Sequence, residues 1–262
     1  MKNLLSQKLG KYYLDRTRAF KLPKRSTRTI DKNGVLLNKI PYTQRWNYYP
    51  CDISLYALGN FEKFLDTDNP KYKKVFLKQA DWLVSNIRIK NGFGVWEHHY
   101  KLPFYNFKIP WVHGMAQGLS ISVLLRAFQI TDNDSYFETA TQAYNSYKVN
   151  ISEGGIKFID SNKNVWFEEY AILPPPHILN GFIFSLFGIY DYFRVTQNQA
   201  VLDLWTEGID TLINNIPRYD TAYWSLYNLS QKYPATYNYH NLHIKQLNVL
   251  SIITKERVIR DY

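Results

Sequence analysis

The chain has 262 residues, 45% of them hydrophobic and 21% charged, which suits one large globular domain or two small ones. It contains no run of 18 apolar residues that could span a membrane. Lysine and arginine total 32 against 22 for aspartate and glutamate, which favours an acidic polysaccharide as partner over nucleic acid, since no RNP, zinc-finger or helix-turn-helix signature occurs; simple solubility is the alternative explanation of the charge. Cys51, the only cysteine, excludes an intramolecular disulfide and a cysteine-based metal cluster, and the lack of a secretory h-region predicts a location in the cytoplasm or at its inner membrane face.

In chain order, an N-terminal extension (residues 1–42) comes first, and we expect it to pack on the remainder, residues 43–262. Three similar segments follow, each with an apolar-periodic helix, a polar break and a second amphipathic helix. They cover residues 54–86, 121–147 and 184–215. Their breaks begin at Thr67, Thr131 and Thr196, spaced by 64 and 65 residues, and a fourth partial copy over residues 247–257 breaks at Thr254.

Helix pairs with this spacing are too long for tetratricopeptide or HEAT units, and they suit an α/α toroid whose inner and outer helices alternate around a central cleft. Between the pairs, residues 91–110 and 154–166 are predicted to form β-hairpins or long loops over the mouth of the cleft. The alternation in IKFID, directly after Gly154-Gly155, supports a short β excursion there. The predicted fold class is therefore mainly α.

An acidic pair, Glu168-Glu169, precedes Tyr170 and the apolar stretch at 181–192. These acids are either solvated loop residues or are turned inward toward a ligand. Neighbouring carboxylates cannot easily flank one glycosidic bond, as a glycosidase requires. Proton transfer needs only one Tyr, Glu or His on each face of a substrate carbon, so the segment favours that chemistry.

Other stretches rich in Tyr, His and Asn lie at residues 45–50, 225–228 and 237–243. His240 and His243 are spaced for metal ligation, but no third ligand is placed by the sequence, and neither a GxSxG elbow nor a P-loop occurs. We therefore predict no metal and no cofactor. The aromatic content of 17%, with 22 tyrosines, suits a carbohydrate cleft, where flat rings with a polar edge bind sugars.

Together these motifs resemble the D-glucuronyl C5-epimerases, which act on heparan-type polysaccharides, and especially their C-terminal helical domain. The resemblance covers nearly all of residues 43–256. In chain order the matching stretches are TQRWNYYPCDISLYALGNFEKFL, WVHGMAQGLSISVLLRAF, WFEEYAILPPPHILNGFIFSLFGIYD, PRYDTAYWSLYNL and YNYHNLHIKQL. It implies an incomplete α/α barrel that inverts C5 of a uronic acid residue, D-glucuronate to L-iduronate, with an acidic glycan as substrate and a homodimer as a further expectation.

The resemblance also implies roles for individual residues. Glu169 and Tyr239 are expected as opposed proton-transfer groups, with Tyr170 and Tyr227 as supporting donors, while Glu168 is expected to be structural. The expected substrate-binding residues are Arg45, Tyr48, Tyr49, Trp111, Gln117, Asn180, His240 and His243. Of these, His240, His243 or Arg45 would supply the positive charge that a tyrosine base and the substrate carboxylate both need.

Two departures from the family pattern stand out. The tyrosine that matches Tyr227 is commonly followed by Asp-Leu-Arg, whereas this chain has Asn228-Leu229-Ser230 and lacks the arginine. The β-rich domains of larger family members are also absent. Two alternatives therefore stay open: a lyase or hydrolase on the same fold, and a non-catalytic glycan-binding relative.

Overall fold

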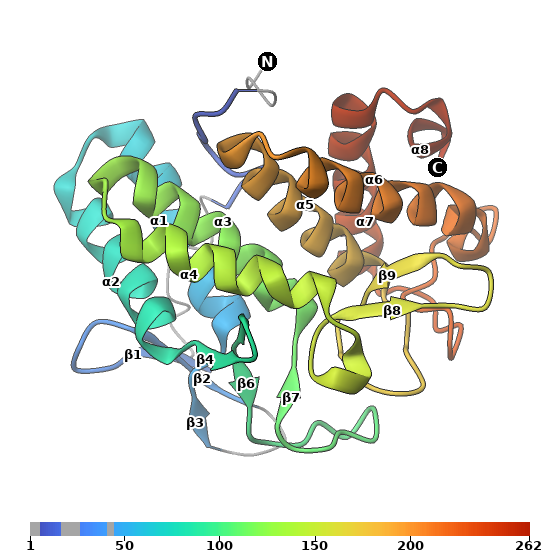
Figure 1. Ribbon diagram of the computed structural model, residues 1–262, viewed down its shortest axis with the longest axis horizontal. Coiled ribbons are helices and arrows are strands. Elements are labelled where there is room, and N and C mark those ends of the chain that lie inside the picture. The colour runs from blue at the N-terminus through green and yellow to red at the C-terminus, as the bar shows by residue number, and fades with distance from the viewer. Residues whose placement is uncertain (1–5, 17–26, 41–44) are drawn as a thin grey trace.

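The computed structural model describes residues 6–16, 27–40 and 45–262 (Figure 1). This part of the chain is mainly helical, with small β-hairpins, as predicted. The helices are α1 (Pro50–Thr67), α2 (Pro70–Asn86), α3 (Gly114–Thr131), α4 (Asp134–Asn145), α5 (Leu179–Thr196), α6 (Gln199–Asn215), α7 (Tyr237–Thr254) and α8 (Arg257–Asp261). No described helix combines the length and the apolar character needed to cross a membrane.

The helices form successive hairpins whose first members pack side by side. Helices α1, α3, α5 and α7 contact one another in that order, and each also contacts the helix that follows it in the chain. Figure 1 shows α1 and α7 on opposite sides of the molecule, with α3 and α5 between them. The closest approach is between α3 and α5, where a Cβ on Gly188 would lie 2.4 Å from Gly118 Cα. Glycine at both positions therefore lets the two backbones touch.

All of the hairpin turns share one local design, and it explains why the breaks could be located from sequence. The first helix of each hairpin ends at the predicted threonine: Thr67, Thr131, Thr196 and Thr254. Each threonine hydroxyl donates to the carbonyl four residues earlier and accepts the N–H two residues later. The residue after the threonine is left-handed, and in the first three turns an Asn then caps the next helix.

We call α1, α3, α5 and α7, the first helices of the hairpins, the inner helices. The β-hairpins lie at the N-terminal ends of these inner helices, and we call this end of the molecule the mouth (Figure 1). The strands that pair there are β4 (Arg88–Lys90) with β5 (Phe93–Val95), β6 (Glu97–His98) with β7 (Trp111–Val112), and β8 (Lys157–Ile159) with β9 (Val165–Phe167). The predicted β segments at 91–110 and 154–166 are thus confirmed. A further antiparallel sheet of β1 (Arg28–Ile30), β2 (Leu36–Lys39) and β3 (Trp46–Asn47) was not predicted.

The opposite end of the inner helices, which we call the floor, is covered by residues 6–16. Arg126 of α3 donates to the Gly10 carbonyl, and Arg194 of α5 donates to the carbonyls of Ser6 and Lys8. Tyr12 and Tyr13 are buried against these helices. The predicted boundary between residues 42 and 43 lies outside the described residues, so the division of the chain there remains a prediction.

Candidate active site

Glu168 and Glu169 follow β9 directly and are both buried, with 1% and 4% of their surface exposed. Successive side chains of an extended segment point to opposite faces, so the two acids reach different partners. Glu168 binds one residue twice, through Oε1 to His177 Nδ1 at 2.5 Å and through Oε2 to the His177 N–H at 3.0 Å. These bonds fix the loop ahead of α5, which is a structural role. Both acids are turned inward, as the second interpretation of the segment required.

Glu169 is held by neutral groups. Asn180 Nδ2, at the start of α5, donates to Oε2 at 3.1 Å, and the Tyr227 hydroxyl donates to Oε1 at 3.5 Å. Within residues 6–16, 27–40 and 45–262, no lysine or arginine forms an ion pair with this carboxylate. A buried carboxylate normally acquires a cationic partner or becomes protonated. Glu169 is therefore an unusual acid in the described part of the molecule.

His113, the N-cap residue of α3, is the third neighbour of Glu169. Its Nδ1 accepts the Ala116 N–H at 3.1 Å, so the neutral ring carries its proton on Nε2. That nitrogen lies 3.5 Å from Glu169 Oε1 and 3.4 Å from the Tyr49 hydroxyl. His113 was not predicted as a site residue, although it lies in the stretch WVHGMAQGLSISVLLRAF, because nothing in the local sequence distinguishes a capping histidine from one that contacts a ligand.

The position of Glu169 depends on two close approaches of the backbone. The Gly114 N–H donates to the Glu169 carbonyl at 2.7 Å, which ties the segment to the start of α3. A Cβ on Gly181 would lie 2.2 Å from Glu169 Oε2 and 2.4 Å from its Cβ. Only glycine at position 181 leaves room for the carboxylate against α5.

A pocket of about 400 Å³ opens at the mouth and is lined in part by Tyr227, whose hydroxyl contacts Glu169; we call it the tyrosine pocket. Its lining residues are Phe104, Tyr105, Tyr170, Tyr227, Gln231, Tyr233, Pro234, Thr236 and Tyr239. The rings of Tyr227 and Tyr239 lie 4.8 Å apart, and Tyr170 packs edge-on against Phe107 and Trp111. The structure thus brings together all four residues that were expected to carry the chemistry.

Three phenols of this pocket, those of Tyr170, Tyr227 and Tyr239, are kept protonated by their surroundings. Burial, reinforced by the Glu169 carboxylate, raises the pKa of Tyr170 and of Tyr227 above the usual value near 10. The same two causes raise the pKa of Tyr239 to about 12, and a hydrogen bond with Tyr227 acts in the opposite sense. At neutral pH these tyrosines are therefore proton donors rather than bases.

Three of the expected substrate-binding residues, Tyr49, Trp111 and Asn180, contact His113, Tyr170 and Glu169, respectively. The Tyr49 hydroxyl lies within 3.4 Å of His113 Nε2. Trp111 is buried next to Tyr170, and its indole N–H donates to the Tyr100 carbonyl at 2.6 Å. Asn180 donates to Glu169 and is itself only 2% exposed. These residues position Glu169 and Tyr170 from beneath the pocket surface.

Gln117 is not placed at the pocket. It is completely buried, and its amide donates to the Gly94 carbonyl and to Ser146 Oγ while its oxygen accepts the Trp96 N–H. These bonds join α3 to β5 and to the end of α4. The expectation of substrate binding is corrected to a role in packing, because no group of this side chain is left to face a ligand.

The expected cations are also elsewhere. His240 and His243 both bind Ser225 Oγ through Nδ1, at 3.0 and 2.8 Å, and His240 stacks on Trp224 in a different pocket. Burial, with His240 nearby, lowers the pKa of His243 to about 3, so this ring is neutral at physiological pH. Arg45 is exposed next to β3. The prediction that these three residues supply positive charge at the phenols is not supported by their placement.

Metal binding finds no support in the described ranges, where no group of three His, Cys, Asp or Glu side chains is arranged to hold an ion. The site as it stands combines one buried carboxylate, one neutral imidazole and several protonated phenols. Such a set can accept a proton at one point and donate a proton at another.

Comparison with known proteins matches residues 90–262 to the family described as D-glucuronyl C5-epimerase C-terminus. The D-glucuronyl C5-epimerase of Caenorhabditis elegans is 31% identical over 233 residues, which cover 79% of this chain and 38% of that protein. An uncharacterized protein of Methanocaldococcus jannaschii is 31% identical over 230 residues, covering 81% of this chain and 74% of that protein. The unsaturated glucuronyl hydrolase of Bacillus sp. GL1 shares the fold, an α/α toroid, with a TM-score of 0.55 and 14% identity over 79% of this chain and 55% of that chain.

Proposed function

Because the chain belongs to the D-glucuronyl C5-epimerase C-terminal family, we propose that it inverts C5 of a uronic acid residue, D-glucuronate to L-iduronate, within an acidic glycan. The chain spans 38% of the length of the nematode epimerase, so its own activity is argued from its site. The observation that carries the proposal is the buried Glu169 carboxylate, held only by neutral groups among the described residues, beside a pocket of protonated phenols.

The first step is removal of the C5 proton by Glu169. That proton is weakly acidic because C5 lies next to the substrate carboxylate, and the electrons of the broken C–H bond spread into that carboxylate as an enolate. The Glu169 carboxylate suits this task because no cation in the described structure competes for its charge. The phenols of Tyr170 and Tyr227 supply hydrogen bonds to the charge that develops on the substrate.

The second step is delivery of a proton to the opposite face of C5 by the Tyr239 hydroxyl, which leaves a phenolate. Tyr227 lies between the two groups, 3.5 Å from Glu169 Oε1 by its hydroxyl and 4.8 Å from Tyr239 by ring centre. Proton exchange through Tyr227 and with the solvent that reaches the open pocket returns Glu169 to its carboxylate and Tyr239 to its phenol, so C5 acquires a solvent proton. The cycle then consumes nothing and is reversible, as an epimerisation must be.

The architecture is consistent with an extended substrate. We infer an incomplete toroid, open between α1 and α7, because these helices end the row of inner helices on opposite sides of the molecule (Figure 1). The tyrosine pocket lies at the mouth and is open to solvent, so a polymer can present an internal residue to it.

The test is deuterium incorporation at C5 of heparosan, the unsulfated uronic acid polymer, incubated with the protein in D2O. We expect incorporation without cleavage of the chain. Glu169→Gln and Tyr239→Phe should each reduce the rate by about 10² to 10⁴, the usual contribution of a positioned acid or base. Tyr223→Phe, at a phenol that is 84% exposed and outside the tyrosine pocket, is the matched control and should keep the full rate.

Other outcomes would identify the alternatives. Unsaturated products released along with C5 exchange would indicate a lyase. Glycan binding with no exchange on any uronate polymer would indicate a non-catalytic relative, and the absence of an arginine at Ser230 would then be the first feature to change.

A further inference from the structure

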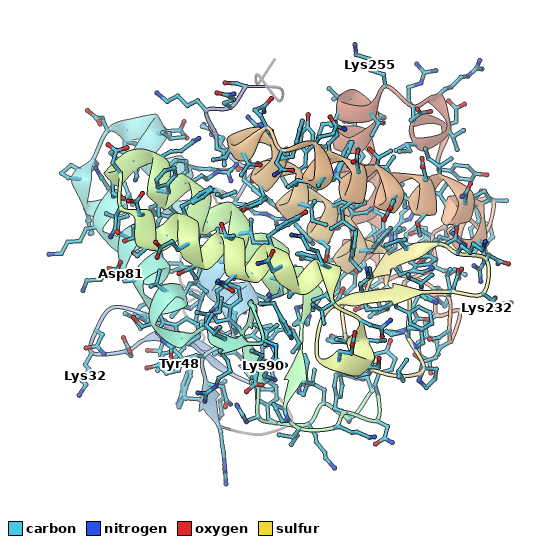
Figure 2. All side chains as sticks on the ribbon, in the orientation of Figure 1. Lys32, Tyr48, Asp81, Lys90, Lys232 and Lys255 are labelled. Atoms are coloured by element: carbon cyan, nitrogen blue, oxygen red, sulfur yellow. The ribbon has the colours of Figure 1, made fainter. Side chains whose placement is uncertain are left out.

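The tyrosine pocket contains no lysine, arginine or histidine among its described lining residues, although the proposed substrate is anionic along its whole length. A second pocket of about 400 Å³ lies at the same end of the molecule, between α2 and the β4–β6 strands. We call it the Trp82 pocket. Its lining includes Tyr48, Trp82, Asn86, Arg88 and His99. Figure 2 places Tyr48 and Lys90 at this end of the molecule, opposite Lys255 at the end of α7.

The Trp82 pocket has a rigid aromatic wall. The ring of Tyr48 stacks on Trp82 with 5.1 Å between centres and 29° between planes, while 40% of Tyr48 remains exposed. The Tyr48 hydroxyl donates to Asp31 Oδ2 at 2.8 Å, which fixes the ring in place. A half-exposed ring that is already immobilised can bind the apolar face of a sugar with little loss of conformational entropy.

Positive charge lies beside that wall. Arg88 is exposed on β4, and no carboxylate within the described ranges forms an ion pair with it. Glu97, the one carboxylate among the described residues that line this pocket, pairs with Lys90 at 2.5 Å and lies 3.6 Å from His99 Nε2. Arg88 therefore remains available to an anion, and a guanidinium binds a carboxylate or sulfate with two parallel hydrogen bonds.

The two pockets share no lining residue, but a row of packed rings connects them. His98 lines the Trp82 pocket and stacks on Trp111 at 4.2 Å, and Trp111 in turn packs against Tyr170 at 5.6 Å. Tyr48 and Tyr49 are consecutive, and the second of them reaches His113 beside Glu169. An oligosaccharide whose reacting residue occupies the tyrosine pocket can thus extend toward Tyr48.

We infer that the Trp82 pocket is a second glycan subsite, which binds an anionic sugar several residues away from the reacting one through Tyr48 and Arg88. It rests on the proposed function for the class of polymer, but it assigns charge recognition to a place outside the reaction pocket. Tyr48, which the family resemblance implies as a substrate-binding residue, then binds the glycan in this remote subsite.

The experiment measures binding in the Glu169→Gln background, where turnover does not interfere. Affinities for a heparosan trisaccharide and a heparosan hexasaccharide are compared by calorimetry. We expect Arg88→Ala and Tyr48→Ala each to weaken the hexasaccharide about tenfold, the size of one charge-assisted hydrogen bond or one aromatic contact, and to affect the trisaccharide much less. The hexasaccharide affinity of Arg88→Lys should lie between those of the unsubstituted Arg88 and Arg88→Ala, because lysine keeps the charge but cannot form two parallel hydrogen bonds.

Lys74→Ala is the matched control, since Lys74 is exposed on α2 outside the pocket lining and its loss changes the net charge equally. Binding of an N-sulfated hexasaccharide and of a neutral chitin hexamer is measured in the same way, to compare sulfated, carboxylated and uncharged ligands. Only the affinities for the anionic hexasaccharides should depend on Arg88. Equal losses for the short and long oligosaccharides, or no loss in either variant, would overturn the inference. Length-dependent binding without any C5 exchange in the unsubstituted protein would instead overturn the proposed function and leave the subsite standing.

Discussion

Two buried carboxylates lie at opposite ends of helix α5, and their surroundings differ completely. Asp191, at the floor, is paired with Arg126 Nη1 at 2.6 Å and Arg194 Nη1 at 3.4 Å, and it also accepts the Tyr13 hydroxyl at 2.7 Å. Glu169, at the mouth, is held by an amide, a phenol and a neutral imidazole. An ion-paired carboxylate stabilises the fold, whereas one held by neutral donors keeps its charge available for a proton.

The largest expected effect comes from applying one isosteric change at both ends. Asp191→Asn leaves two arginines buried without their counter-charge and should lower the free energy of unfolding by about 3 to 5 kcal/mol. Glu169→Gln should change it by no more than about 1 kcal/mol, since amide donors can satisfy either group. Urea unfolding followed by circular dichroism measures both.

Asp203→Asn, at an exposed position of α6, controls for the loss of a carboxylate in general. The comparison between floor and mouth would break down if the two buried variants lost equal stability.

A second variant sharpens the mouth side of the comparison. Gly181→Ala places a Cβ 2.2 Å from Glu169 Oε2, so the carboxylate must shift. We expect C5 exchange to fall by about 10², because a displacement near 1 Å of a reacting group costs that much, while the protein still folds. Gly10→Ala, at a floor position with no atom within 4 Å of the new Cβ, should alter neither quantity. An undiminished exchange rate in Gly181→Ala would show that Glu169 need not lie against α5.

Acid pH should lower the stability of the fold through His243, in helix α7. The pKa of His243 is lowered to about 3 in the folded protein, mainly by burial, against about 6.5 in the unfolded chain. The stability contributed by the neutral ring is therefore complete above pH 6.5 and is lost as the pH falls toward 3. This contribution changes by up to about 1.4 kcal/mol per pH unit in that window. His243→Asn should flatten the dependence of unfolding free energy on pH, and an unchanged slope would mean that this ring does not titrate as described.

The smallest expected effect belongs to the turns at the floor. Asn133→Ala removes the side-chain bond to the Ser135 N–H and should cost about 1 kcal/mol of stability, as N-cap replacements usually do, with no change in C5 exchange. Asn69→Ala and Asn198→Ala remove the same bond in the other turns and should match it. A loss of exchange in any of the three would contradict the separation of floor from mouth.

The floor turns were predictable because their chemistry is local. Each threonine and its left-handed neighbour, followed by a capping asparagine in the first three turns, interact within a few residues, so the four helix ends follow from the sequence alone. The hairpin of β8 and β9 likewise follows from alternation and paired glycines. The inward orientation of the acidic pair was one of two open interpretations, and the structure selects it.

The remaining features depend on tertiary packing. The spacing of His240 and His243 shows that they share a face of α7, but the rotation of α7 about its axis decides that this face meets Ser225 and not the phenols. Gln117 was expected at the substrate because of the family resemblance, whereas its partners, Gly94 on β5 and Ser146 just after α4, lie 23 and 29 residues away in the chain. The tautomer of His113 required its N-cap bond to be seen.

The strap of residues 6–16 across the floor also has a consequence for how the protein is made. Arg194 donates to the Ser6 carbonyl, 188 residues earlier in the chain, and Arg126 to the Gly10 carbonyl, 116 residues earlier. At synthesis rates of about 5 to 20 residues per second, residue 6 is made roughly 10 to 40 s before residue 194. During that interval the side chains of Leu9, Tyr12 and Tyr13 lack the helices against which they are buried, so this segment stays exposed on the nascent chain until α3 and α5 have been made.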